Sequence, residues 1–219
     1  PLKIAQLKNH TKIVALLQQH ISVRKKSREQ MKSAITIGDA YTVETILNSE
    51  MIGVNDVVVP IQFQRDRLLH FACRKGHVNV VNVLLKRKNI VVNQTNQDGA
   101  TPLFVACWRG HVDVVQLLLA RKEIHINQAG KRGWTPLFIA CQAGHVDVVE
   151  LLLASNEILI NKADESGWTP LSIACSQGQL NVVKTLLARK NIAVDQANKH
   201  EKTPLHTACD NGHADVVQL

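Results

Sequence analysis

The 219-residue sequence contains few aromatic residues and no long apolar stretch. Phe, Trp and Tyr together make up 4% of the chain, and three of these residues are tryptophans. A membrane-spanning helix needs about 18 or more consecutive apolar residues, so the sequence predicts no membrane span. No signal peptide is recognisable, although a chain that opens on Pro1 is expected to be a piece of a longer protein. Because aromatic residues are scarce, the position of each tryptophan needs its own explanation.

The sequence also lacks the motifs that mark common catalytic and cofactor sites. It has no nucleophile-elbow pattern, no H-E-x-x-H pair and no Walker phosphate loop. The glycine-containing stretch at 129–133 lacks the flanking strand and helix that a phosphate loop requires. We therefore expect no catalysis, no cofactor and no small-molecule substrate within these residues. A catalytic domain elsewhere on a longer parent chain stays open.

The five cysteines are spaced 34 residues apart, so they are one structural position sampled five times. Helices stacked side by side lie about 8–10 Å apart, whereas a disulfide needs Cα atoms within about 7 Å. We expect free thiols, which in odd number are typical of a reducing, intracellular compartment. A zinc site is excluded for a similar reason, because zinc ligands lie about 2 Å from one metal. The histidines that share this wide spacing are therefore expected to be structural: His77, His111, His145 and His213.

The net charge of +8 is concentrated at one end of the chain. Residues 1–32 hold eight basic residues and one acidic residue, whereas residues 33–219 are nearly neutral. The centre of this basic segment is Arg24, Lys25, Lys26 and Arg28. We interpret it as solvated chain between structural units, with binding of acidic lipid or nucleic acid as the alternative. No aromatic residue is interleaved with the segment, so nucleic acid is not the expected partner.

Nearly the same eleven residues occur four times in the sequence. The stretch TPLFVACWRGH begins at Thr101, and close copies begin at positions 135, 169 and 203. Thr101 is a good helix N-cap, Pro102 suits the first helical position, and Gly110 can end the helix in a left-handed conformation. A second helix is expected in the following VDVVQLLLAR, which is apolar on more than one face. The Ile-His-Ile-Asn run after it has strand character and leads into a hairpin.

The alanine of each copy recurs at positions 5, 34, 72, 106, 140, 174 and 208, which indicates about seven units. A repeat array grows by adding such units rather than by enlarging one core. We divide the chain into irregular N-terminal units at 1–66, which include the basic segment between units, and regular units at 67–219. Together they are expected to form one continuous solenoid, truncated at both ends.

These units resemble the ankyrin repeat, whose pattern is G-x-T-P-L-H-x-A-A-x-x-G-H followed by an apolar helix. The resemblance is strong across residues 67–219 and partial across 1–66. It implies an all-α solenoid in which units of helix, turn, helix and β-hairpin stack into a curved array. Two departures bear on the fold. The unit at Arg67 lacks the Thr-Pro start, so its first helix should be less well capped, and Glu201 replaces a turn glycine.

The resemblance also implies a function, which is the binding of another protein through the concave face and the hairpin tips. We expect a monomeric, intracellular interaction module. Two alternatives stay open. In the first, these residues are the targeting or substrate-recruiting part of a larger enzyme or of a secreted bacterial effector, which would act in the host cytosol. In the second, the basic segment binds acidic lipid or nucleic acid.

The candidate binding residues are those that vary between units at the positions that the resemblance exposes. All three tryptophans fall among them, and Trp and Arg often dominate the binding energy of interfaces. Equivalent places in adjacent units should put Trp134 and Trp168 side by side. The competing interpretation is that each tryptophan only packs over its own hairpin. The candidates are Arg74, Lys75, Trp108, Arg109, Lys131, Arg132, Trp134, Gln142, Trp168 and Gln177.

Overall fold

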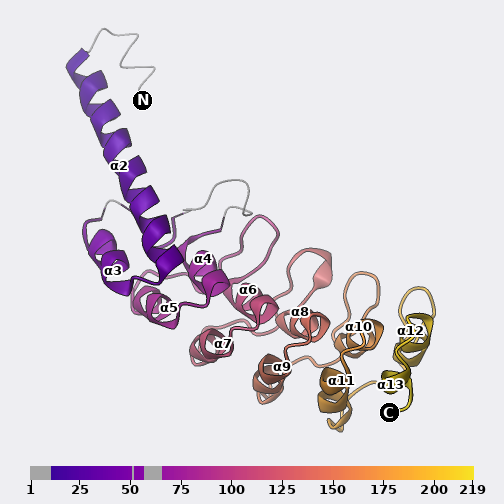
Figure 1. Ribbon diagram of the computed structural model, residues 1–219. Helices are drawn as coiled ribbons and strands as arrows, with labels where there is room; N and C mark the ends of the chain where they lie inside the picture. Colours follow the sequence, from indigo (N-terminus) through magenta and orange to yellow (C-terminus); the bar gives the residue numbers. More distant parts are fainter. Residues whose placement is uncertain (1–10, 51, 57–65) are drawn as a thin grey trace.

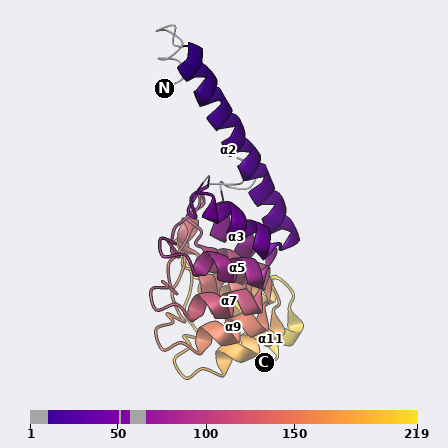
Figure 2. The ribbon, with the colours of Figure 1, turned by 90° about the vertical axis from the view of Figure 1, so that its left-hand side faces the viewer.

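The computed structural model describes residues 11–50, 52–56 and 66–219, which form a single row of stacked helix pairs (Figures 1 and 2). A long helix begins the row and projects away from it. The helices are α2 (Thr11–Ile37), α3 (Ala40–Asn48), α4 (Leu68–Lys75), α5 (Val78–Leu85), α6 (Pro102–Arg109), α7 (Val112–Leu119), the 3₁₀ turn η2 (Lys131–Gly133), α8 (Pro136–Ala143), α9 (Val146–Leu153), α10 (Pro170–Ser176), α11 (Leu180–Leu187), α12 (Pro204–Asp210) and α13 (Ala214–Val217).

The pairs form two layers. Helices α4, α6, α8, α10 and α12 pack on one another as an inner layer, and α5, α7, α9 and α11 pack on one another as an outer layer. The hairpin loops that join successive pairs all project to the same side of the row (Figure 1). We call the side formed by the inner helices and these hairpins the inner face. The all-α solenoid predicted from the repeat is thereby confirmed.

Four of the five inner helices, α6, α8, α10 and α12, begin with the threonine cap that the sequence predicts, and α6 shows the full pattern. The Thr101 hydroxyl accepts a hydrogen bond from the Phe104 amide at 3.1 Å, and Pro102 occupies the first helical position. The helix ends at Gly110, whose φ of 71° lies in the left-handed region. Between these ends, Ala106 and Cys107 are fully buried, which lets neighbouring inner helices approach closely. The repeated letters therefore encode helix ends and close packing.

The repeated glycine and histidine lock adjacent units together. His145 follows α8 and donates its Nε2 hydrogen to the backbone oxygen of Trp108 in the preceding unit, at 3.1 Å. Its ring lies so close to Gly110 that a Cβ at this glycine would sit 2.6 Å from His145 Nδ1. Equivalent bonds join the neighbouring units at His111 and His213. These histidines are structural, as predicted.

We expect Gly110→Ala to lower the free energy of unfolding by about 2–3 kcal/mol, because it adds both backbone strain and a contact with His145. Gly212 provides a matched control. It has the same φ of 71°, but nothing lies within 4 Å of its would-be Cβ, so Gly212→Ala should cost only about 1–2 kcal/mol. Denaturant titration measures the stability of both variants. Repeating it in a His145→Ala background removes the contact with the histidine ring and leaves only the backbone strain. Equal losses in the two variants would show that the histidine contact contributes nothing.

The hairpins stack without forming strands. In residues 11–50, 52–56 and 66–219 no β-strand is present, so the strand predicted at 124–127 is wrong. Successive hairpins share one backbone bond each, such as Lys131 N–H to Asp98 O at 3.0 Å and Glu165 N–H to Arg132 O at 2.9 Å, which is too few for a ladder. A side-chain ladder adds to them. Asn127 donates to Glu157 O at 2.7 Å and accepts from Leu159 N at 3.0 Å, and Asn93 and Asn161 bond in the same way.

The N-terminal part departs from the predicted pattern. The basic segment at 24–28 lies inside the continuous helix α2, not in a linker between two units. The physical reason is that residues 11–37 contain no glycine and no proline, so nothing ends the helix between the two predicted units. The unit that centres on Ala5 lies outside the described residues. The division of the chain at residues 66 and 67 stays a prediction.

Candidate functional site

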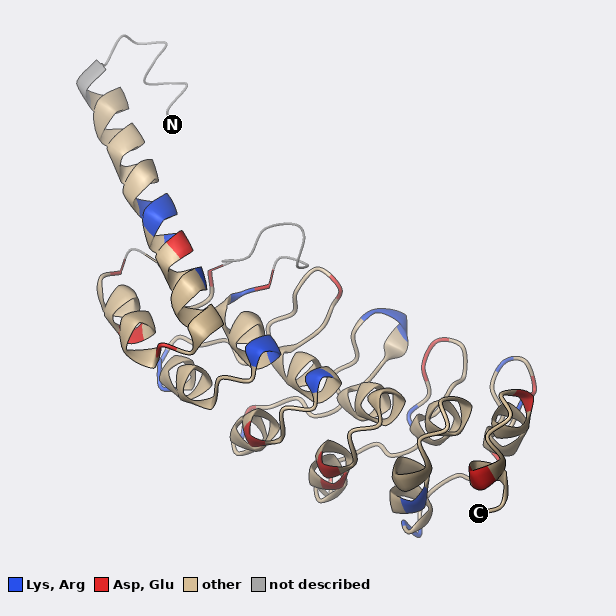
Figure 3. Cartoon of the chain, in the orientation of Figure 1, with Lys and Arg blue, Asp and Glu red and all other residues tan. Residues whose placement is uncertain are grey.

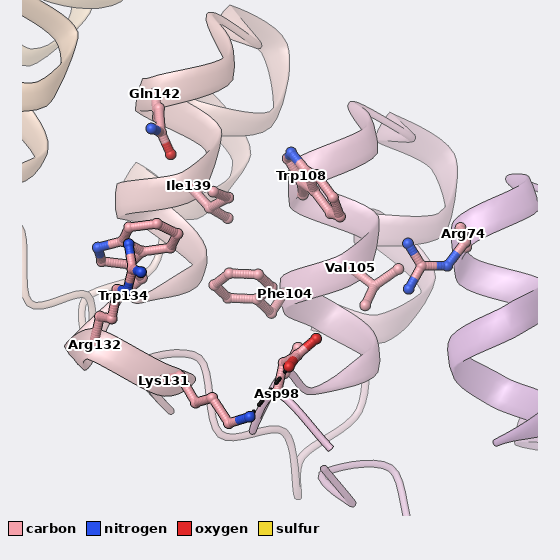
Figure 4. A pocket seen from close by; sticks show the side chains of 11 residues that line it. Arg74, Asp98, Phe104, Val105, Trp108, Lys131, Arg132, Trp134, Ile139 and Gln142 are labelled. Atoms are coloured by element: carbon pink, nitrogen blue, oxygen red, sulfur yellow. Dashed lines mark hydrogen bonds and ion pairs between the residues drawn. The ribbon is translucent and has the colours of Figure 1, made fainter. Parts of the chain in front are cut away.

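Two adjoining hollows lie on the inner face between the inner helices and the hairpins. The first has a volume of about 560 Å³ and the second about 430 Å³. Arg132, Trp134 and Gln142 line both, so we treat the two hollows as one groove, whose first hollow is drawn in Figure 4. The first hollow is lined by Arg74, Asp98, Ala100, Phe104, Val105, Trp108, Lys131, Arg132, Trp134, Ile139 and Gln142. The groove therefore brings together six of the ten predicted binding residues in its first hollow and adds Trp168 in its second.

Trp108 is the tryptophan that is most open to solvent. It lies at the end of α6 with 39% of its surface exposed. The guanidinium of Arg109 lies 4.6 Å from its ring centroid and that of Arg74 lies 5.9 Å away. A cation over an indole face is stabilised electrostatically, so the indole and Arg109 are held together on the surface. This pair stands out from the equivalent positions of the next unit, Gln142 and Ala143.

Arg74 has a structural partner that the sequence did not predict. Its Nε donates to the Asp66 carboxylate at 2.7 Å, and only 11% of the Arg74 side chain is exposed. Asp66 is fully buried and also accepts from Asn96 Nδ2 at 2.9 Å. The pair ties α4 to the next hairpin at the unit whose helix lacks a side-chain cap. The charge of Arg74 is therefore compensated within the fold, while its guanidinium lies near the Trp108 ring at the edge of the first hollow.

His70, one turn from Arg74, should make the stability of this unit depend on pH. Burial holds the pKa of His70 below its ordinary value, although nearby Asp66 favours the charged form. As the pH falls below about 6.5, the unfolded chain takes up a proton that the folded chain resists, so stability should decrease toward acid. His70→Phe, the residue found at the equivalent positions 104 and 138, should flatten this decrease. Urea titrations between neutral and mildly acidic pH measure it, and parallel curves for variant and parent would contradict the prediction.

Trp134 is partly a packing residue. It is half-buried, and its ring stacks on Phe138 with centroids 5.8 Å apart and planes 13° apart. Its Nε1 donates to Asp164 Oδ2 of the next hairpin at 3.1 Å. Arg132 lies over the same indole at 5.5 Å. Trp168 is also half-buried and lines the second hollow together with Trp134. Both tryptophans thus pack over hairpins and still border the groove.

The remaining candidates occupy different surroundings. Lys131 is exposed and forms an ion pair with Asp98 at 3.2 Å. Lys75 and Arg109 are exposed at the ends of α4 and α6 and line neither hollow. Gln177 follows α10 and is exposed, but it lines neither hollow.

The basic segment is partly used by the fold itself. Arg24 and Arg28 approach the Asp56 carboxylate at 3.3 and 3.9 Å. Lys25 and Lys26 remain exposed on the projecting helix α2. Two of the four cations are thus engaged by an acidic side chain, which weakens the alternative that this segment binds acidic lipid or nucleic acid.

The cysteines behave as a packing position. Within the described residues all five are free thiols, and Cys209 alone is exposed. Burial raises the pKa of the Cys107 thiol and raises that of Cys175 to about 11, so these thiols stay protonated and unreactive at neutral pH. In the part of the chain that the structure describes, no cluster of three or more His, Cys, Asp or Glu side chains could hold a metal ion.

The stacked helix pairs make the protein a solenoid of repeated units, with a groove on its inner face. A family model described as ankyrin repeats (3 copies) matches residues 31–129, 69–164, 122–197 and 157–219. The chain belongs to the ankyrin-repeat family. Ankyrin repeats are generally protein–protein interaction modules on a non-catalytic fold. No match was found among curated proteins. None of the helices in the described ranges is long and apolar enough to cross a membrane.

Proposed function

We propose that this protein binds a partner protein through the groove on its inner face, with Trp108 and Arg109 as the main contacts. The observation that supports this is the exposed indole of Trp108, which borders the first hollow beside the apolar side chains of Phe104, Val105 and Ile139. Binding energy at interfaces tends to concentrate in Trp and Arg side chains surrounded by packed neighbours. Trp134, Trp168 and Gln142 extend the same surface along the groove.

The mechanism we infer is rigid presentation of a preformed surface. The hairpins are tied to each other by backbone bonds and by the asparagine ladder, and the inner helices are tied by the histidine bonds. A surface that is already ordered loses little conformational entropy when it binds. The protein acts as a monomer in this account, because the groove is complete within one chain.

Site-specific photo-crosslinking tests the proposed function. A photoreactive amino acid at Gln142, which lines both hollows, should give a defined crosslinked partner in lysate of cells that express the protein. The control position is Lys190, an exposed residue that follows α11 on the outer layer. Crosslinks from Gln142 that disappear in a Trp108→Ala background would support the proposal. The same partner captured only from Lys190 would overturn it.

A finer version of this function concerns a longer parent chain. We propose that the array recruits a substrate or a target for a domain outside these residues, in an intracellular compartment, which for a secreted effector would be the host cytosol. The free, largely buried thiols support the compartment. The flanking coding sequence tests the first part, since a parent chain without any further domain would contradict it.

A further inference from the structure

The charges of the groove are unevenly compensated. The first hollow is lined by three cationic side chains and one acidic side chain. Arg74 is neutralised by Asp66 and Lys131 by Asp98, at 2.7 and 3.2 Å. Arg132 in the hollow and Arg109 beside it have no acidic side chain within 4 Å among the described residues. Two guanidinium charges therefore remain available to a ligand.

Both of these guanidiniums are held against indoles. Arg109 lies 4.6 Å from the centroid of Trp108, and Arg132 lies 5.5 Å from that of Trp134. A stacked guanidinium keeps the N–H groups of its edge free, and these match the two oxygens of a carboxylate. Each Arg–Trp pair thus presents a pre-positioned donor edge beside an apolar surface. Figure 4 shows Arg132 and Trp134 on one wall of the hollow and Trp108 on another.

The hollow between the two pairs has an apolar floor. Phe104, Val105 and Ile139 line it from α6 and α8 (Figure 4). Its volume of about 560 Å³ falls in the range of about 300–1,000 Å³ that accommodates a small ligand. A few side chains of an extended segment fit such a space, and at least one of them should be apolar to cover the floor.

A nucleic-acid backbone matches the groove less well. The second hollow, which continues the groove toward α10, is bordered by Asp164 and Glu165, and Figure 3 shows the acidic colour on this hairpin next to the basic one. A polyphosphate chain running along the groove would meet these carboxylates after passing the two arginines. A short peptide can instead place its acidic residues only where the arginines lie.

We propose that the ligand of this groove is a short acidic segment of the partner protein, with carboxylates on Arg109 and Arg132 and an apolar side chain between them over Phe104 and Ile139. The inference rests on the proposed function and specifies its ligand. The complementary charges give the segment its register. The apolar side chain, which covers the floor beside Trp108, gives part of the affinity.

Selection from a random peptide library displayed on phage tests this inference. Peptides enriched on the parent protein should share acidic residues flanking an apolar or aromatic residue. Fluorescence anisotropy of a selected peptide should then show binding that weakens with salt. Arg109→Gln and Arg132→Asn should each weaken it by about tenfold, because each removes a charged hydrogen-bonded pair. Asn suits position 132, where φ is 66°.

The control variant is Arg189→Gln with Lys190→Gln on the outer side, which should leave peptide affinity unchanged. Selected peptides without acidic residues, no enrichment at all, or equal affinity for the arginine variants would each overturn the inference. Tighter binding of a fluorescent oligo-dT strand than of any selected peptide, lost in the arginine variants, would also overturn it in favour of nucleic acid. A groove-specific crosslink from Gln142 would still uphold the proposed function in the first three cases.

Discussion

Replacing Asp66 with alanine is expected to lower the free energy of unfolding by about 3 kcal/mol. Asp66 is fully buried, and its removal leaves both the guanidinium of Arg74 and the amide of Asn96 without their partner. Breaking a buried pair on one side costs about 3–5 kcal/mol. The lower end applies here because 11% of the Arg74 side chain reaches the surface. Chemical denaturation of the parent and the variant measures the loss.

Two further variants make this result specific. Glu123→Ala removes one partner of the exposed ion pair with Arg121, in which 38% of the Arg121 side chain and 51% of the Glu123 side chain are exposed, and it should lower stability far less than Asp66→Ala does. Adding Arg74→Met to Asp66→Ala removes the stranded charge and should recover part of the loss. Hydrogen exchange should place the destabilisation near α4, because each repeat contacts only its neighbours. A loss no larger than that of Glu123→Ala would contradict the structural role of Asp66.

Trp108→Ala is expected to weaken binding of the crosslinked partner by about 30-fold or more, which corresponds to about 2 kcal/mol. Its effect on stability should stay within about 1 kcal/mol, because the indole is 39% exposed and its main contacts are the guanidiniums of Arg74 and Arg109. Binding titrations of the purified variant, alongside its unfolding curve, separate the two effects.

Trp134→Ala is the informative contrast. Trp134 stacks on Phe138 and donates to Asp164, so its removal should cost about 2 kcal/mol of stability in addition to any loss of binding. Trp134→Phe keeps an aromatic ring over Phe138 and loses only the N–H bond to Asp164. If Trp108→Ala destabilised the fold as much as Trp134→Ala while partner affinity stayed unchanged, Trp108 would be a packing residue and the assignment of the groove would fail.

The helix ends of the regular units could be predicted from the sequence, because the residues that favour a helix end locally occur where the stacking of the units also requires one. Thr101, Pro102 and Gly110 specify where an inner helix begins and ends, and their recurrence fixes the number and spacing of the regular units. Glu201 shows how strongly the array imposes its geometry. It replaces the turn glycine, yet it adopts a left-handed φ of 58° to complete its hairpin. Steric strain at one residue is small compared with the packing of a whole unit.

What the sequence could not predict depends on contacts between units. No sequence pattern singles out Asp66, because only the stacked hairpin brings Asn96 and Arg74 to it. The ion pairs of Arg74 with Asp66 and of Arg28 with Asp56 also join residues that do not occupy equivalent positions of the repeat. Helix α2 was missed for the opposite reason. The repeat pattern favoured two units, while the lack of glycine and proline in residues 11–37 allowed one helix.

The groove could be predicted from the sequence only in part. The resemblance predicted which positions would lie on the inner face, because it exposes the hairpin tips and one side of the first helix of each unit. It could not distinguish Trp108, which is exposed, from Trp134, which is half-buried against Phe138, since that difference arises from the neighbouring hairpin. Among the described residues, Arg109 and Arg132 have no acidic side chain within 4 Å, and they stand out only after the ion pairs of Arg74 and Lys131 are assigned.

Amide hydrogen exchange of the complex with the crosslinked partner tests the central claim most directly. We predict that the partner slows exchange in the hairpins at 96–100 and 130–134 and at the groove ends of α6 and α8, around Trp108 and Gln142. The outer helices α7, α9 and α11 should exchange as in the free protein. Slowed exchange confined to those outer helices or to α2, with the inner face unchanged, would contradict the claim that this groove is the binding site.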